Sequence, residues 1–331
     1  SLLNIMARDL PSLTDWKYTK SSPSGKNNFK LMFKVIDYNL FHDIFTPDFF
    51  AVNPVFSGVF NDEDQFFQMN LKVDTIKYQS ESVHGLKLLA HNKKGQVNVE
   101  LTSDYVGLKK PMGLNNFGIN ATAKNNLADY HLSWNNDAEA KNDGNIKGVL
   151  GIERLDSVWT HINTLDLVIE NNLWSIDSTN KLVFSPGKVD VEHFNVRSAF
   201  ESIQMDGVLT SRSQNGLMVN ARNFQLGNLG RLFSKVKTDI TGSLSGKIEV
   251  LGKTDDLIFK SDLDVDGFHL NGQSFGKVKI RSDYLAEESK LKLNVVAQNQ
   301  SEVLKGNTFE LKGNYFPKQS GRIDLTCKFS N

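Results

Sequence analysis

The feature of this sequence that most limits its fold is an alternation of apolar and polar residues with a period of two. Leu291, Leu293 and Val295 are separated by single polar residues, and Asp264 separates Leu263 from Val265. Because successive side chains of a β-strand point to opposite faces, the pattern places apolar side chains on one face of a sheet and charged ones on the other. Parallel strands buried on both faces read as continuous apolar runs, so the alternation predicts an antiparallel sheet.

Glycine-containing clusters separate the alternating runs. With a strand and a turn in about every 8–12 residues, the chain would hold roughly 25 to 30 strands, more than one β-sandwich uses. The phrases Asp206–Leu209, Thr241–Gly246 and Lys312–Tyr315 each place a glycine at the predicted start of a new strand. The clusters predicted to be hairpin turns are residues 93–95, 142–144, 214–216 and 271–272.

The sequence predicts an all-β protein with one or two short helices, at Tyr38–Phe45 and Leu226–Val236. No linker rich in proline, serine and glycine follows residue 25, so residues 1–331 are predicted to be one continuous elongated sheet segment with a soft boundary near 145–190. The sequence opens at Ser1 without an initiator Met or a signal-peptide pattern, and the alternation still runs at Ser330, so we expect an internal fragment of a larger protein. The sequence has no run of about 18 apolar residues, so no membrane-spanning helix is predicted.

Composition excludes several classes of protein. The 38 basic residues balance the 38 acidic ones, which argues against binding of nucleic acid through charge. The single cysteine, Cys327, excludes a disulfide scaffold and a cysteine-based zinc site. The chain has 22 Phe but only 7 Tyr, and because phenylalanine carries no polar group, this excess indicates a dry surface.

Residues that could carry out catalysis are not grouped in any recognisable motif. The histidines are scattered, and no nucleophile elbow, phosphate loop or dinucleotide fingerprint occurs, so no enzymatic activity, cofactor or metal is predicted. Asp262–Gly267 matches the first half of a calcium loop, but Gln273 occupies the twelfth position, where such a loop needs a bidentate acid. We therefore interpret the three aspartates of this segment as the outward face of a strand, with calcium binding as the alternative.

The second half of the chain carries short phrases of glycine and apolar residues in a recognisable order. Together with Ile76–Tyr78 and Tyr130–Asn136, they resemble the TamB (translocation and assembly module subunit) group of the AsmA-like family, most of all the versions in Bacteroidetes-type bacteria. The family's helical membrane anchor and its conserved C-terminal end are not visible. The phrases in the second half are Phe194–Val196, Ile203–Val208, Asn223–Leu229, Ile240–Ile248, Phe268–Gly276 and Leu311–Pro317.

The resemblance implies a long sheet curled into a trough, a β-taco-like groove with an apolar concave face. It implies a periplasmic location in the cell envelope of a diderm bacterium, with the full-length protein anchored in the inner membrane. The implied partners are phospholipid or another acyl-chain lipid, and a BamA/TamA-type barrel of the outer membrane contacted through regions outside this segment. The implied functions are lipid transport between the two membranes and assembly of outer-membrane proteins.

A one-sided sheet must cover its apolar face, and an acyl chain is a suitable occupant because each buried methylene contributes about 0.8 kcal/mol. The alternatives are the closed core of an ordinary β domain, a structural module that binds β-barrel client strands, and, more weakly, a carbohydrate-binding domain, which would expect exposed Trp and Tyr. The predicted lipid-lining residues are Val189, Val191, Phe194, Val196, Leu263, Val265, Phe268, Leu270, Val278, Ile280, Leu291, Leu293, Val295, Phe309, Leu311, Ile323 and Leu325.

Overall fold

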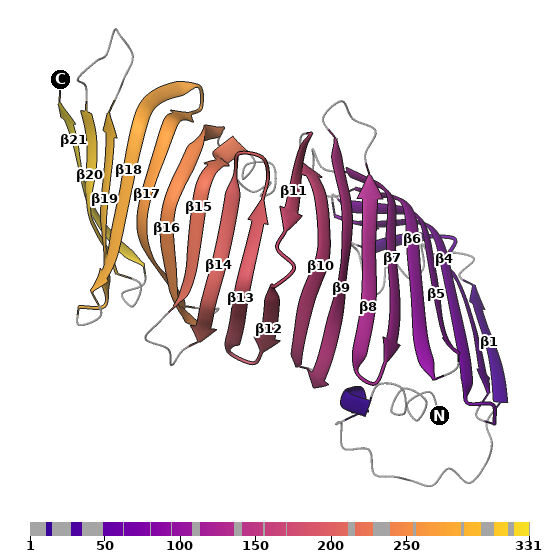
Figure 1. The fold of residues 1–331 in the computed structure, drawn as a ribbon. Helices are drawn as coiled ribbons and strands as arrows, with labels where there is room; N and C mark the ends of the chain where they lie inside the picture. Colours follow the sequence, from indigo (N-terminus) through magenta and orange to yellow (C-terminus); the bar gives the residue numbers. More distant parts are fainter. Residues whose placement is uncertain are drawn as a thin grey trace. The chain divides into compact units, whose positions relative to one another are not determined.

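A computed structural model of the 331-residue chain describes most of it as β-strands. The strands, 21 in the described part of the chain, belong to one antiparallel sheet, which confirms the predicted all-β fold (Figure 1). The described residues are 11–14, 28–34, 49–61, 63–79, 81–93, 95–107, 113–135, 141–154, 156–169, 171–210, 216–227, 239–253, 256–285, 288–298, 308–316 and 321–330.

The chain divides into two compact units, Ser1–Ser178 and Thr179–Asn331. The division falls inside the range 145–190, where the sequence suggested a soft boundary. The described strands are fewer than expected because many are long: β17 alone has 15 residues, whereas the expected number assumed a strand and a turn in about every 8–12 residues. No helix among the described residues is long and apolar enough to cross a membrane.

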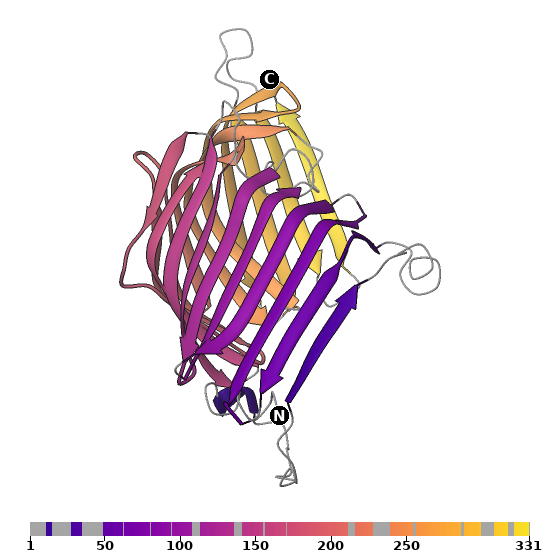
Figure 2. The ribbon, with the colours of Figure 1, turned by 90° about the vertical axis from the view of Figure 1, so that its right-hand side faces the viewer.

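The first unit is a meander in which consecutive strands pair from β3 to β11; β1 pairs with β3, and β2 pairs with β4 (Figure 2). A short 3-10 helix, η1 (Pro11–Thr14), was not expected from the sequence. The strands are β1 (Asn28–Lys34), β2 (Phe49–Val52), β3 (Val55–Asn61), β4 (Phe66–Tyr78), β5 (Glu81–Lys93), β6 (Gln96–Gly107), β7 (Gly113–Lys124), β8 (Leu127–Asn135), β9 (Asn142–Arg154), β10 (Ser157–Ile169) and β11 (Asn172–Ile176).

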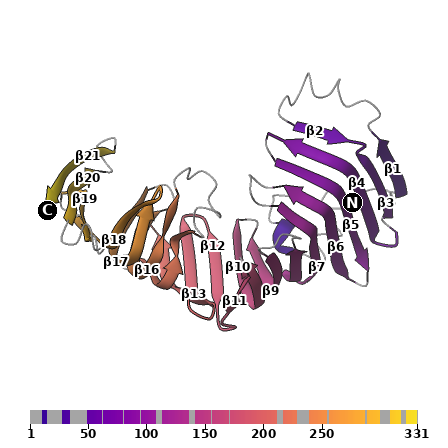
Figure 3. The same ribbon diagram turned by 90° about the horizontal axis from the view of Figure 1, so that it is seen from above.

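The second unit is also a meander of consecutive antiparallel strands, which Figure 3 shows as a single layer. The strands are β12 (Lys181–Ser185), β13 (Lys188–Arg197), β14 (Ser202–Thr210), β15 (Leu217–Gln225), β16 (Ile240–Lys253), β17 (Asp256–Leu270), β18 (Gln273–Leu285), β19 (Lys290–Gln298), β20 (Thr308–Phe316) and β21 (Arg322–Ser330).

Two of the predicted turns are confirmed, one is wrong, and one lies partly outside the described residues. Residues 271–272 connect β17 to β18. β5 ends at Lys93 and the paired strand β6 begins at Gln96, so the cluster 93–95 falls between them, although residue 94 lies outside the described residues. The cluster 142–144 instead begins β9, where Gly144 pairs with Trp134 of β8. A Cβ atom on Gly144 would collide with the Trp134 ring, so this glycine serves a close side-chain contact rather than a turn. Of the cluster 214–216, only Gly216 is described.

The helix predictions are tested only in part. Leu226 and Gly227 are helical, which agrees with the start of the segment Leu226–Val236, but residues 228–236 lie outside the described residues. The segment Tyr38–Phe45 lies outside them entirely.

The prediction that certain glycines begin strands is wrong for Gly207 and Gly313, which lie inside β14 and β20. In the phrase Thr241–Gly246, Gly242 is the third residue of β16 and lies near its start, whereas Gly246 lies further inside the strand. A Cβ atom on Gly246 or Gly313 would meet a backbone carbonyl oxygen of the next strand, that of Asp262 or Asp324. These positions need glycine because the neighbouring backbone approaches too closely for a side chain.

We expect Gly246→Ala to destabilise the second unit. Gly246 has a φ of +138°, and a non-glycine residue in such a conformation costs about 1–3 kcal/mol before the clash with Asp262 is added. Gly227→Ala is the matched control, because a Cβ there meets no atom within 4 Å, and its effect should stay within about 0.5 kcal/mol. Urea unfolding followed by circular dichroism measures both, and equal midpoints for the two variants would contradict the prediction.

Candidate functional site

The backbone register of the second unit gathers apolar side chains on one side of the sheet. Residues directly opposite each other in an antiparallel pair point to the same face. We call this side of β12–β21 the apolar face. One cross-strand row that defines it from β16 to β21 consists of Gly246, Leu263, Ile280, Val295, Leu311 and Cys327.

The structure places all of the predicted lipid-lining residues on this apolar face. On β13, Val189 and Val191 pair with Leu209 and Gly207 of β14. The predicted residues of β17–β21 either belong to the cross-strand row named above or alternate with its members along the same strands, so they point to the same side.

Two β-bulges keep the alternating residues on the same face where the spacing changes from two to three. Between Val191 and Phe194 the register shifts at His193, which has a φ of 50°, so Phe194 returns to the side of Val191. Between Val265 and Phe268 the same occurs at Gly267, with a φ of 61°. Each bulge absorbs one extra residue, and without it the strand's later side chains would switch faces.

Phenylalanine rings form a contact series at one end of these strands. The ring centroids of Phe268 and Phe275 lie 5.9 Å apart, those of Phe275 and Phe309 lie 6.4 Å apart, and those of Phe309 and Phe329 lie 5.1 Å apart. We call these four residues the phenylalanine ladder. Phe275 and Phe329 were not among the predicted lining residues. The alternation of β18 misses Phe275 because Gly276, with a φ of 71°, interrupts it.

Exposure of the apolar face changes from the middle strands to the last one. Val265 and Val278 are 1% and 4% exposed, in a cluster with Leu226 and Ala297. On β21 the same face is open: Leu325 is 44% exposed and Ile323 is 60% exposed. The face therefore combines a packed core around β17 and β18 with an accessible apolar surface at β21.

The opposite side of the second unit is charged. Arg281 Nε lies 2.6 Å from Asp262 Oδ1, and Arg281 Nη2 lies 3.2 Å from Asp264 Oδ1. Lys277 Nζ lies 3.4 Å from Asp266 Oδ1. The three aspartates of the possible calcium loop thus lie within β17 and face basic residues of β18, which confirms their interpretation as the outward face of a strand.

The first unit repeats this one-sided arrangement, although no lining residues were predicted there. Phe60, Phe67, Ala90, Val97, Ala123 and Ala128 form its buried cluster. At β1 the side chains of Phe29, Leu31 and Phe33 are exposed, on the side of the sheet that bears this cluster. The period-two alternation of these three residues is the sequence signal that marks this face.

The geometry of the site thus consists of apolar sheet faces with charged residues on the other side. Within the described part of the chain, no three His, Cys, Asp or Glu side chains are placed to hold a metal ion. Comparison with protein-family models, with curated proteins and with solved structures found no match to this chain.

Proposed function

We propose that the apolar face of the Thr179–Asn331 unit binds the acyl chains of phospholipid or of a related lipid. In this proposal the chain is a periplasmic segment of an envelope protein that carries lipid between the inner and outer membranes or supports outer-membrane protein assembly. The observation that carries the proposal is the apolar face itself, which runs from β12 to β21 in a single layer, with charged residues on the other side.

The energetics favour an acyl chain as the occupant. Exposed apolar surfaces of this kind are uncommon in soluble proteins unless they contact a partner. Each methylene removed from water contributes about 0.8 kcal/mol, so an acyl chain gains affinity from contact along its length without a polar anchor. The phenylalanine ladder offers such a surface across β17–β21, and Phe329, at its end, is 77% exposed.

Native mass spectrometry of the purified chain tests the proposal directly. We expect adducts with the masses of phospholipids or fatty acids after purification from bacterial cells, and their return when a delipidated sample is incubated with phospholipid. A delipidated protein that binds no added lipid, although its circular dichroism spectrum is that of the untreated protein, would contradict acyl-chain binding.

A second candidate function is binding of β-barrel client strands, and one observation favours it. β21 hydrogen-bonds to β20 from Arg322 to Ser330, and no other described strand pairs with it. An extended peptide adds to a strand edge through main-chain hydrogen bonds. A photo-crosslinking residue in place of Phe329 separates the two functions in cells, because it captures lipid in the first case and polypeptide in the second.

A further inference from the structure

A polar pocket lies on the charged side of the second unit, beside the turn between β13 and β14. Its volume is about 350 Å³. Arg197 of β13 pairs with Ser202 of β14, and Ser202 pairs with Arg222 of β15. In the next row Asn195 pairs with Gln204. Directly paired residues share a face, so Arg197, Ser202 and Arg222 stand on the same side of three adjacent strands, with the serine on the middle one.

The arginines of this pocket differ from the other arginines that the structure describes. Arg154, Arg281 and Arg322 each lie within 3.0 Å of an aspartate oxygen. Arg197 and Arg222 have no acidic partner in the described part of the chain. Their backbones are two strand spacings apart, about 10 Å, so their long side chains can both reach one anion between them.

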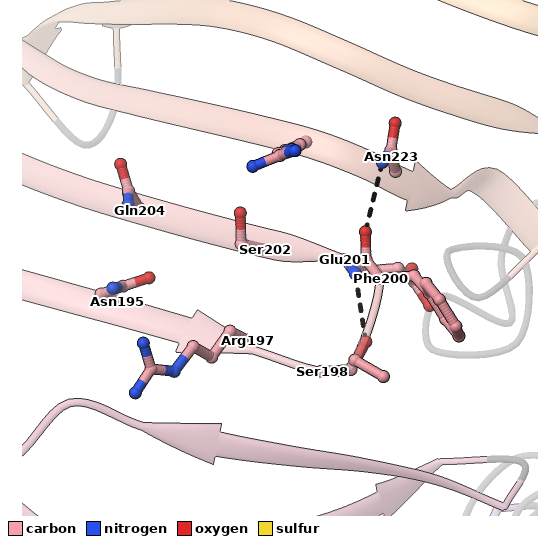
Figure 4. Close-up of a pocket in the computed structure, with 10 residues that line it drawn as sticks. Asn195, Arg197, Ser198, Phe200, Glu201, Ser202, Gln204 and Asn223 are labelled. Carbon is pink, nitrogen blue, oxygen red and sulfur yellow. Dashed lines mark hydrogen bonds between the residues drawn. The ribbon is translucent and has the colours of Figure 1, made fainter.

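Hydrogen bonds hold the turn that forms one wall of the pocket. Ser198 N donates to Glu201 O at 2.9 Å, and Glu201 N donates to Ser198 Oγ at 3.2 Å. Asn223 Nδ2 donates to Phe200 O at 3.3 Å, and Figure 4 shows this bond together with the one from Glu201 N. These bonds tie the turn to β15, so the pocket is formed before any ligand binds.

The only carboxylate in the wall of the pocket has a structural partner. Glu201 is buried, and its Oε2 accepts a hydrogen bond from Gln225 N at 2.8 Å. This side chain therefore fastens the turn to the end of β15 and pairs with neither arginine.

From this arrangement we propose that the pocket binds a phosphate group, with Arg197 and Arg222 as its charged ligands and Ser202 as a neutral donor between them. A guanidinium group donates two parallel hydrogen bonds to phosphate oxygens, and a phosphate monoester carries close to two negative charges at neutral pH. Two arginines without acidic partners therefore match the charge of one phosphate monoester. The pocket is on the opposite side of the sheet from the apolar face, so this proposal does not rest on acyl-chain binding.

The phosphate can come from solution or from a lipid headgroup, and Phe200 distinguishes the two sources. Phe200 lies in the β13–β14 turn beside the pocket and is 81% exposed. An exposed aromatic ring next to basic side chains can enter the interface of a membrane whose headgroups the arginines hold. A free phosphate would make no use of this ring.

Isothermal titration calorimetry of the full chain with inorganic phosphate tests the site. We expect saturable binding at millimolar phosphate, a loss of affinity of about 10-fold for Arg197→Gln or Arg222→Gln, and no detectable binding by the double variant. Arg154→Gln is the matched control. Arg154 is an exposed arginine at the end of β9, outside the unit that holds the pocket, so its replacement should leave the affinity for phosphate unchanged. Saturable binding that survives in the double variant would overturn the proposal.

Flotation with vesicles identifies the source of the phosphate. Vesicles of phosphatidylcholine with added phosphatidate, which bears a phosphate monoester, are compared with vesicles of phosphatidylcholine alone. Arginine-dependent binding to the phosphatidate vesicles that weakens with Phe200→Ser supports the site with a headgroup as its ligand. Binding of inorganic phosphate alone supports the site with a soluble ligand. Binding of neither, by a protein with an unchanged circular dichroism spectrum, refutes it.

Discussion

Replacing Val265 with aspartate is expected to unfold the strands around β17 and β18. Val265 is 1% exposed and lies in one cluster with Leu226, Val278 and Ala297. A carboxylate there would have no basic partner among the residues of this cluster, and burying an unpaired charge costs about 4 kcal/mol or more. Hydrogen–deuterium exchange should show that peptides of β17 and β18 lose their protection from exchange.

Gln298→Asp provides the matched control for this substitution. Gln298 is exposed on the charged face and pairs with Lys277 of β18, next to the buried Ala297. A new carboxylate opposite a lysine should change the free energy of unfolding by no more than about 0.5 kcal/mol. If Val265→Asp were as stable as this control, the cluster around Val265 would not be a packed core.

Placing two aspartates on the open part of the apolar face is expected to abolish most lipid binding while the fold persists. Ile323 and Leu325 are largely exposed on β21, so Ile323→Asp with Leu325→Asp buries little charge in the protein alone. A bound acyl chain would lose its contact with both side chains. Loss of about three methylene contacts, at about 0.8 kcal/mol each, lowers affinity on the order of 50-fold.

Competition with a fluorescent fatty acid measures this loss, and the charged side of β20 and β21 supplies its control. Thr308→Asp with Thr326→Asp adds the same charge to β20 and β21 on the charged side. This control should bind the fatty acid as the unaltered chain does. Equal affinities for both double variants would contradict binding of the fatty acid to the apolar face of β21.

The side of the sheet on which each apolar residue lies could be predicted from the sequence because it depends on local geometry. A period of two assigns Leu263, Val265 and their neighbours to one face whatever the partner strand is, and antiparallel pairing then aligns these faces across the sheet. The charged side of β17 followed in the same way from Asp262, Asp264 and Asp266.

Residues that break the alternation could not be placed in this way. Phe275 joins the phenylalanine ladder because the positive φ of Gly276 changes the direction of the strand locally. The cluster 142–144 has the composition of a turn, yet it lies in a strand, and its glycine is needed because the Trp134 ring occupies the space that a Cβ atom would take. In both cases a contact with another strand decides the backbone or the residue type, and the local sequence does not contain that contact.

The all-β class, the antiparallel pairing and the apolar side of the second unit can therefore be read from the sequence, since they follow from the alternating directions of neighbouring side chains. The depth of burial cannot, because it depends on which strands pack around a residue: Val265 is enclosed, whereas Leu325, on the same face, is open. The pocket of Arg197 and Arg222 was likewise decided by tertiary structure. These arginines are separated in sequence, and the registers of β13, β14 and β15 place them on the two strands that flank Ser202.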